Sequence, residues 1–300
     1  MELQVENICK SFGSKQVLKG INFSVSGGEA LGYLGRNGAG KTTTIRILTD
    51  IFRADSGQVL LNGKPIDHNK VRMGYLPEER GLYPKTKVGE QMIYIGELRG
   101  MSHSDAKRSA KALLEELEAT DYWDKKLETL SKGNQQKIQL AIAVLHDPDI
   151  VILDEPFSGL DPVNSTMLKK LIVKEVNRGK LVLFSSHQMP YVEEFCEHIC
   201  IINHGEIVLN GKIQEIKRSY PRNRIALYPE NEVNAYAEAL KRFFSDIKNK
   251  NNFLEVTLED EAQKPKLFQA IAEIGKNVDR VEVIEPTLEE IFVEKAGGLQ

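Results

Sequence analysis

The sequence has little of what marks a secreted or a membrane-spanning chain. Its 300 residues include three cysteines, and an odd cysteine count without a secretion signal argues against a disulfide framework. No apolar run approaches the roughly 18 residues that a bilayer span needs, and the first residues, MELQVENICK, lack the apolar core of a secretory signal. We therefore expect a protein of the cytosol or of the cytosolic side of a membrane.

Charge of one sign is not in excess either. The chain carries 40 basic and 43 acidic residues, a formal net charge of −3. This near-balance argues against a nucleic-acid binder that works through a strong positive field. A composition of 41% apolar and 28% charged residues excludes wholesale disorder. A chain of this length can bury a full core and has room for about two domains.

A small group of potential metal ligands is present, namely Cys196, His198, Cys200 and His204. Their spacing matches none of the usual zinc patterns, so a metal site here is conceivable but disfavoured. The pattern instead favours Cys196 at the end of an amphipathic helix and Cys200 inside an apolar strand, where free cysteine packs as a small hydrophobe.

The first two thirds of the chain alternate short apolar strands with helical segments. This alternation predicts an α/β fold with a mainly parallel sheet. The region of about 88–146 differs, because it is helical in period and has no convincing strand. We interpret it as a helical subdomain inserted into a domain of residues 1–217. The expected strands of that domain are 31–34, 59–61, 71–75, 150–153, 181–185 and 199–202.

A basic, aperiodic stretch at 217–224 predicts a domain boundary. Beyond it, strand-like segments at 224–228, 253–258 and 281–284 lie between helical ones. Thr287 and Glu290 form a capping box that opens the last helix. We therefore expect a small C-terminal α+β domain over residues 222–300.

The strongest local signal is the segment GRNGAGKTT, which fits the phosphate-binding pattern G-x-x-x-x-G-K-[ST]. It follows an apolar strand and opens an apolar helix, as a P-loop requires. Glycines let backbone N–H groups surround phosphate oxygens, and the helix N-terminus adds positive potential. The lysine suits the β- and γ-phosphates, and the first threonine suits Mg²⁺. The predicted nucleotide-binding residues are Gly35, Arg36, Asn37, Gly38, Ala39, Gly40, Lys41, Thr42 and Thr43.

Two carboxylates follow a buried strand further along the chain. The segment VILDEP delivers Asp154 and Glu155 to the carboxyl end of that strand, where open α/β sheets place their ligands. Asp154 can hold Mg²⁺ through water, and Glu155 can act as the general base for an attacking water. A solvated acidic turn is the alternative, and the P-loop makes it the weaker one.

The segment LSKGNQQK precedes an apolar helix, and Ser131 is its expected N-cap. Such a helix tip is a suitable anion site. Because this chain's P-loop already surrounds its own phosphates, Ser131 is free to bind the γ-phosphate of another subunit's nucleotide. An ordinary capped helix is the alternative, which the local pattern alone favours.

Taken together and in this order, the motifs resemble those of the ATP-binding cassette (ABC) ATPases over about residues 1–217. The resemblance rests on Phe12, GRNGAGKTT, LSKGNQQK, VILDEP, SGLD at 158–161 and SSH at 185–187. It implies a P-loop NTPase core that stacks head to tail with a second one and encloses two ATP molecules with Mg²⁺. It assigns catalysis to Glu155 and His187, and nucleotide binding beyond the P-loop to Phe12 (adenine stacking), Ser131, Gly133 and Asp161.

The chain departs from the family pattern at two motifs. Glu78 stands where the family usually has glutamine, and we expect it to be a metal ligand together with Thr42 and Asp154. In LSKGNQQK, Lys132 replaces glycine and Asn134 replaces glutamine. Ser131 and Gly133 are retained, so the contact with the partner's phosphate stays plausible.

The resemblance extends to the exporter-type subunits that pair with separately encoded permeases. Residues 74–83 and the tail segment EPTLEEIFV resemble this group, which includes sodium-efflux and drug- or antibiotic-efflux ATPase subunits. It implies an ATPase at the cytoplasmic face of the cell membrane, peripheral, acting as a homodimer or heterodimer, with no nucleic-acid partner. The alternative is a soluble ABC-type ATPase acting on ribosomes or DNA. A P-loop GTPase is disfavoured because no N-K-x-D sequence occurs.

Overall fold

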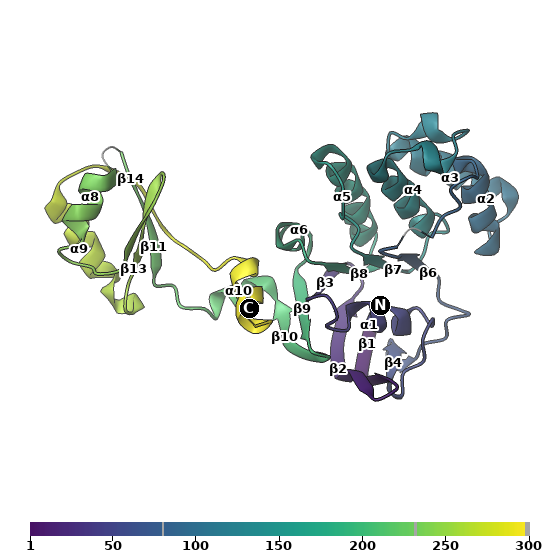
Figure 1. Cartoon of the computed structure of the whole chain (residues 1–300), viewed down its shortest axis with the longest axis horizontal. Helices are drawn as coiled ribbons and strands as arrows, with labels where there is room; N and C mark the ends of the chain where they lie inside the picture. Colours follow the sequence, from purple (N-terminus) through teal and green to yellow (C-terminus); the bar gives the residue numbers. More distant parts are fainter. Residues whose placement is uncertain (80, 231–232, 298–300) are drawn as a thin grey trace. The chain divides into compact units, whose positions relative to one another are not determined.

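The computed structural model describes residues 1–79, 81–230 and 233–297. The chain forms two compact units (Figure 1). The first comprises Met1–Ile213 together with the segment from Phe292 onward, and the second comprises Gln214–Ile291. The division therefore begins close to the expected boundary. The sequence analysis assigned the whole tail to the second domain, whereas the contacts return its last segment to the first unit.

The first unit contains an antiparallel sheet that the sequence analysis missed. Its strand order is β2-β1-β4-β5, and the two long strands β1 and β2 alternate buried and more exposed residues over much of their length, as half-buried strands do. The segment 59–61 was predicted for a mainly parallel sheet; this was wrong, because it belongs to β4 and pairs antiparallel with β1. The strands are β1 (Glu2–Phe12), β2 (Lys15–Ser26), β4 (Ser56–Leu61) and β5 (Lys64–Pro65).

The second sheet of this unit is the predicted parallel one. It has the order β10-β9-β3-β8-β7-β6, and only its edge strand β10 runs antiparallel to its neighbour. Its central strands are fully buried and carry continuous apolar runs, as a sheet covered on both faces requires. The strands are β3 (Ala30–Gly35), β6 (Met73–Leu76), β7 (Ile150–Asp154), β8 (Leu181–Ser186), β9 (His198–Asn203) and β10 (Glu206–Lys212).

Strand β7 shows how the sheet is covered on both faces. Ile150 and Ile152 belong to the core shared with the antiparallel sheet and α1 (Lys41–Leu48). Val151 and Leu153 point the other way and meet α4 (Lys132–Val144) and α5 (Pro162–Asn177). Figure 1 shows α1 on one side of β7 and β8, and α5 on the other. The buried strand thus ends at a fixed position, with Asp154 as its last residue.

The region that the sequence analysis interprets as an inserted helical subdomain is built from helices. It consists of α2 (Val88–Leu98), α3 (His103–Glu116), the 3-10 turns η1 (Thr120–Tyr122) and η2 (Leu127–Thr129), and α4. Figure 1 shows these helices in one group beside the β6 edge. Gly74 in β6 permits this packing, because a Cβ there would lie 2.1 Å from the Ala143 carbonyl oxygen of α4.

Cysteine burial in the first unit agrees with the sequence. Cys196 ends α6 (Met189–Phe195) and Cys200 lies in β9; both side chains are buried. Burial raises the pKa of both thiols well above the usual range, so they remain protonated and pack as small hydrophobes. His198 pairs with Glu29 at 3.2 Å.

The second unit has its own core. Its antiparallel sheet has the order β12-β13-β11-β14, with α8 and α9 packed against it. The predicted capping box is confirmed, since Thr287 N–H donates to Glu290 and Glu290 N–H donates to the Thr287 hydroxyl. The elements wholly within it are β11 (Arg224–Pro229), α8 (Val233–Leu240), β12 (Ile247–Lys250), β13 (Phe253–Thr257), η3 (Glu261–Gln263), α9 (Lys264–Ile274) and β14 (Val278–Val283). Two helices cross the boundary: α7 (Ile213–Arg218) begins at the last residue of the first unit before the boundary, and α10 (Leu288–Lys295) belongs to the first unit from Phe292 onward.

Within the described ranges, no helix is both long and apolar enough to cross a membrane.

Candidate nucleotide site

The P-loop connects the end of β3 to the start of α1, as the sequence predicts. Gly38 and Gly40 have φ values of 79° and 117°, in the left-handed region that side chains disfavour. A Cβ on Gly40 would also lie 2.7 Å from Leu18 Cδ2. The backbone conformation therefore favours glycine at this position, and a Cβ there would also crowd the Leu18 side chain.

Lys41 is held inside the loop that it follows. Its Nζ donates to the carbonyl oxygens of Gly35 at 2.6 Å and Arg36 at 3.4 Å. No described side chain caps the start of α1, so its first N–H groups are available to an anion. The loop thus presents uncapped backbone donors beside a buried ammonium group.

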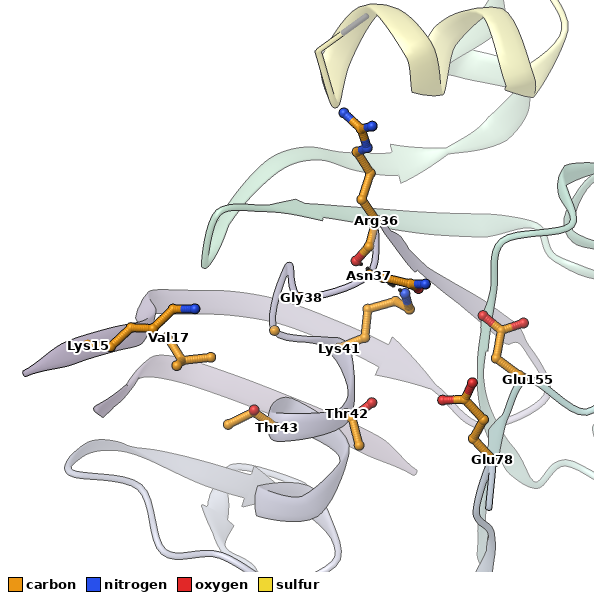
Figure 2. Close-up of a pocket in the computed structure, with 11 residues that line it drawn as sticks. Lys15, Val17, Arg36, Asn37, Gly38, Lys41, Thr42, Thr43, Glu78 and Glu155 are labelled. Carbon is orange, nitrogen blue, oxygen red and sulfur yellow. Dashed lines mark hydrogen bonds between the residues drawn. The ribbon is translucent and has the colours of Figure 1, made fainter. Parts of the chain in front are cut away.

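These residues line a cavity of about 430 Å³. Figure 2 shows Lys41 and Thr42 on one wall, with Glu78 and Glu155 facing them. The P-loop and Glu78 lie together, as expected, although Ala39 is not among the lining residues. Lys15 and Val17 of β2 also line the cavity, and no motif in the sequence indicates them. The lining residues are Lys15, Val17, Arg36, Asn37, Gly38, Gly40, Lys41, Thr42, Thr43, Glu78 and Glu155.

Asp154 and Glu155 are fixed by the neighbouring strand. The Ser185 hydroxyl donates to Asp154 Oδ1, and the Glu155 N–H donates to the Ser185 carbonyl oxygen at 3.1 Å. Glu155 has a φ of 51°, which turns the chain sharply at the strand end. Both side chains are buried, with 1% and 5% exposure. The carboxylates consequently have fixed and different environments.

Asp154 is suited to a cation. Burial, with Glu78 and Glu155 nearby, raises its pKa above the ordinary value, although the Ser185 hydrogen bond opposes this. Its Oδ2 is buried and has no hydrogen-bond partner among the described residues. With the Thr42 hydroxyl and Glu78, it offers the hard oxygen donors that Mg²⁺ prefers. The described residues include no group of three or more His, Cys, Asp or Glu side chains that could hold a metal ion by themselves.

His187 contacts the predicted general base directly. Its Nδ1 lies 2.9 Å from Glu155 Oε2, and its backbone N–H donates to the same oxygen at 3.4 Å. The imidazole is 60% exposed, so it can reach a ligand in the cavity mouth. The structure therefore unites Glu155 and His187, as the sequence predicts.

A second cavity of about 460 Å³ adjoins the first and shares several of its walls. Its residues are Gly35, Arg36, Asn37, Glu78, Glu155, His187 and Phe292. Phe292 is the exception, because it is aromatic and comes from the far end of the sequence. It belongs to the tail segment EPTLEEIFV noted in the sequence, but nothing in that segment indicates that Phe292 lines this cavity.

Ser131, Gly133 and Asp161 are not among the described residues that line these two cavities. Ser131 is exposed and caps α4, accepting from Asn134 N–H at 3.3 Å. Asp161 caps α5 by accepting from Asn164 N–H at 2.9 Å, and this bond lowers the pKa of Asp161. The two caps are adjacent, since a Cβ on Gly133 would lie 2.9 Å from Asn164 Nδ2.

Phe12 also lies outside the lining of these cavities in the described chain. It ends β1, is 46% exposed, and packs edge-on against Phe52 with a centroid distance of 5.6 Å. An exposed ring is available for stacking on a base. Its adenine contact stays a prediction.

Comparisons with known proteins agree with this site. Residues 18–158 match the family model described as ABC transporter. Residues 211–296 match the model of the DrrA1-3-like ATP-binding protein C-terminal domain. The ABC transporter ATP-binding protein YhaQ of Bacillus subtilis is 39% identical and covers 99% of both chains. The linearmycin resistance ATP-binding protein LnrL of the same organism is 31% identical over 98% of each.

Solved structures place the first unit in the same fold. One, described as the ATP binding subunit of an ABC transporter, is 27% identical with a TM-score of 0.67, and the match covers 73% of this chain and 93% of that one. The ADP conformation of the cassette MJ1267 is 25% identical with a TM-score of 0.63, covering 72% and 92%. The motifs, the cavity they line and the full-length relatives agree: this chain belongs to the ABC transporter ATP-binding proteins and has the DrrA1-3-like C-terminal domain.

Proposed function

We propose that this chain is the ATP-hydrolysing subunit of an ABC exporter and drives a separate membrane permease. The observation that carries the proposal is the position of Glu155. It is buried, contacts His187 at 2.9 Å, and faces the P-loop lysine across one cavity. A base held opposite a phosphate-binding loop is suited to activating water at a γ-phosphate.

Nucleotide binding uses groups that are already in position. The uncapped N–H groups of α1 and the side chains of Lys41 and Thr43 face the triphosphate. On ATP binding, Lys41 Nζ would exchange its present contacts with the carbonyl oxygens of Gly35 and Arg36 for phosphate oxygens. Phe12 provides an exposed ring for the adenine. The cavity of about 430 Å³ is of a size that suits a small-molecule ligand.

Thr42, Asp154 and Glu78 would hold Mg²⁺ beside the phosphates. When bound, Mg²⁺ neutralises charge on the β- and γ-phosphate oxygens. Asp154 is fixed for this role by Ser185 and has a free buried oxygen. Glu78 brings a charge where glutamine would bring a neutral amide, so we expect tight metal binding.

Hydrolysis follows from the Glu155 geometry. As the water oxygen bonds to the γ-phosphorus, Glu155 takes the water's proton, and the bond from phosphorus to the bridging oxygen breaks to release ADP and phosphate. His187 orients the Glu155 carboxylate through its ring and its N–H. The exposed imidazole also reaches the γ-phosphate side.

The site is completed by a second copy or by another cassette. Ser131 caps α4 and is exposed, away from its own chain's nucleotide cavities. A head-to-tail pair brings the Ser131 tip of one subunit to the γ-phosphate bound by the other. Asp161, which caps the adjacent α5, accompanies it to the same interface.

The permease contacts the surface around α2, which also places the subunit at the cytoplasmic face of a membrane. Tyr83 and Tyr94 are about half exposed and suit an apolar partner helix. Met92 of the same helix is fully buried inside the helical subdomain and does not contribute to this surface.

Export of a drug, an antibiotic or sodium ion is the transport activity that we propose. LnrL is named for linearmycin resistance, and a relative from Burkholderia lata, 36% identical over 70% of this chain and of that protein, is named for Nod factor export. LnrL matches nearly the whole chain, including the C-terminal unit, which favours an antibiotic-like cargo over sodium ion.

The test is Glu155→Gln. This change keeps the shape and removes the base, so ATP still binds but is not consumed. We expect ATP with Mg²⁺ to convert the variant to a stable dimer in size-exclusion chromatography with light scattering, while turnover falls by about a thousandfold. A variant that stays monomeric with ATP, or that hydrolyses at the parent rate, contradicts the proposal.

Identifying the cargo requires the membrane partner. The protein that co-purifies with this chain from detergent-treated membranes is reconstituted with it in vesicles. ATP-dependent flux of an antibiotic-like dye and of sodium ion is then compared, with Glu155→Gln as the inactive control. Movement of neither compound argues against efflux of these classes.

A further inference from the structure

Phe292 forms one wall of the cavity that holds Glu155 and His187. Every other residue in that lining is a P-loop residue, Glu78 or one of this pair. An aromatic ring is of no use to a phosphate or to a proton transfer. Its presence beside the base and the histidine therefore indicates a role other than chemistry.

The segment that begins at Phe292 is held against the first unit. Asn203 at the end of β9 donates from Nδ2 to the Ala296 carbonyl oxygen at 3.2 Å. Ala296 is 3% exposed and Phe292 is half-buried, whereas Val293 between them is exposed. Figure 2 shows the Arg36 side chain directed from the P-loop toward this segment. We call residues 292–296 the C-terminal plug.

The plug lines the part of the site that a second copy would occupy in the proposed pair. In the proposed pair, the Ser131 tip of the partner must reach the γ-phosphate next to Glu155 and His187. Phe292 lines that space, and two groups cannot share one volume in a close-packed interface. The Phe292 ring also cannot supply the hydroxyl that Ser131 brings.

We propose that the C-terminal plug is an autoinhibitory element that competes with a second copy of this chain for the open side of the nucleotide site. With the plug in place, ATP binds to a single subunit, and productive pairing requires Phe292 to leave. This inference rests on the proposed function, because it presupposes the pair that it regulates.

The first experiment compares two variants in the Glu155→Gln background. Phe292→Ala removes the ring, and Val293→Ala is the matched control on the exposed side of the plug. Dimer formation is measured by light scattering against ATP concentration. We expect Phe292→Ala to lower the ATP concentration for half-maximal pairing on the order of tenfold, because a partly buried Phe is lost from the competing state, and Val293→Ala to leave it unchanged.

The outcomes separate the two proposals. Suppose that Glu155→Gln pairs with ATP, and that adding Phe292→Ala leaves the ATP concentration for half-maximal pairing unchanged or raises it. The autoinhibitory role of the plug is then wrong, while the proposed function stands. A raised midpoint would make Phe292 a permanent wall of the working site. If pairing fails both with and without Phe292→Ala, the proposed function is wrong, and the autoinhibitory role of the plug, which depends on it, is wrong as well.

A second experiment locks the plug with a reversible bond. Asn203→Cys combined with Ala296→Cys, again in Glu155→Gln, places a thiol on each residue of the existing contact, in which the Asn203 side chain reaches the Ala296 backbone. We expect the oxidised protein to remain monomeric with ATP and the reduced protein to pair. Each single cysteine variant is the control. Oxidised protein that carries the cross-link and still pairs as readily as the reduced form overturns the inference.

Discussion

The chemistry of the site depends on how single residues are held. Asp154 and Glu155 are consecutive, yet Ser185 binds the first side chain and His187 the second. The left-handed backbone of Glu155 separates their directions. One carboxylate is thereby left with a buried free oxygen for a cation, and the other with an oriented oxygen for a proton.

Glu78 provides a test at this scale. Glu78→Gln restores the side chain usual in the family and removes a negative charge from the metal side of the cavity. We expect the Mg²⁺ concentration for half-maximal ATPase activity to rise on the order of tenfold, with little change in maximal rate. Activity is measured at fixed ATP over a magnesium series.

Glu79→Gln is the matched control, because the neighbouring carboxylate is exposed and does not line either described cavity. An equal shift in both variants would reduce Glu78 to a general surface charge. No shift in either would remove it from the metal site.

At the scale of elements, α4 links the separate motifs. Ser131 caps its start, Gln136 donates to the Pro156 carbonyl oxygen at 3.2 Å, and Ala143 meets Gly74 of β6. One helix thus joins the exposed tip, the segment after the catalytic base and the strand that leads to Glu78. A movement of α4 would therefore displace the Ser131 tip, the segment after Glu155 and the strand before Glu78 together.

The two capped helices of the subdomain allow a controlled prediction. Ser131→Ala and Ser102→Ala each remove a serine cap, from α4 and α3 respectively, and should each lower the free energy of unfolding by about 1 kcal/mol. Only Ser131→Ala should also lower ATPase turnover, by about tenfold or more, because it alone loses a transition-state donor.

Denaturant unfolding and steady-state turnover are compared for both variants. If Ser131→Ala retains the turnover of Ser102→Ala, Ser131 is a cap and nothing else, and the partner contact is wrong.

Strong periodic or motif-bearing elements were predictable from the sequence, and the others were not. The apolar runs of β7, β8 and β9 and the P-loop connection are local signals, as is the Thr287 cap. Strands β1 and β2 were missed because their alternation includes many polar residues, and β4 was assigned to the wrong sheet because pairing is not a local property. Phe292 was missed since its neighbours lie about a hundred or more residues away.

At the scale of the whole molecule, the chain has two separate hydrophobic cores. The cluster around Leu183 belongs to the first unit and the cluster around Leu254 to the second. Both leucines are fully buried. Separate cores of this kind give separate unfolding events.

We expect two calorimetric transitions for the parent protein. Leu254→Ala should destabilise only the second unit, by about 2–5 kcal/mol, and so lower the midpoint temperature of only one transition. Nucleotide binding should stay intact. Leu183→Ala is the matched change in the core of the first unit. It should lower the midpoint temperature of the other transition and weaken nucleotide binding. A single transition that shifts in both variants would show that the units unfold together.

The chain leaves the first unit at Ile213 and returns to it at Phe292. A segment of the same chain meets its target at an effective concentration that is set by the connecting chain and does not depend on how many molecules a cell contains. A second copy has no such advantage and must arrive by encounter. Dispersed subunits would therefore pair less readily and hydrolyse less ATP than subunits that a permease holds close together.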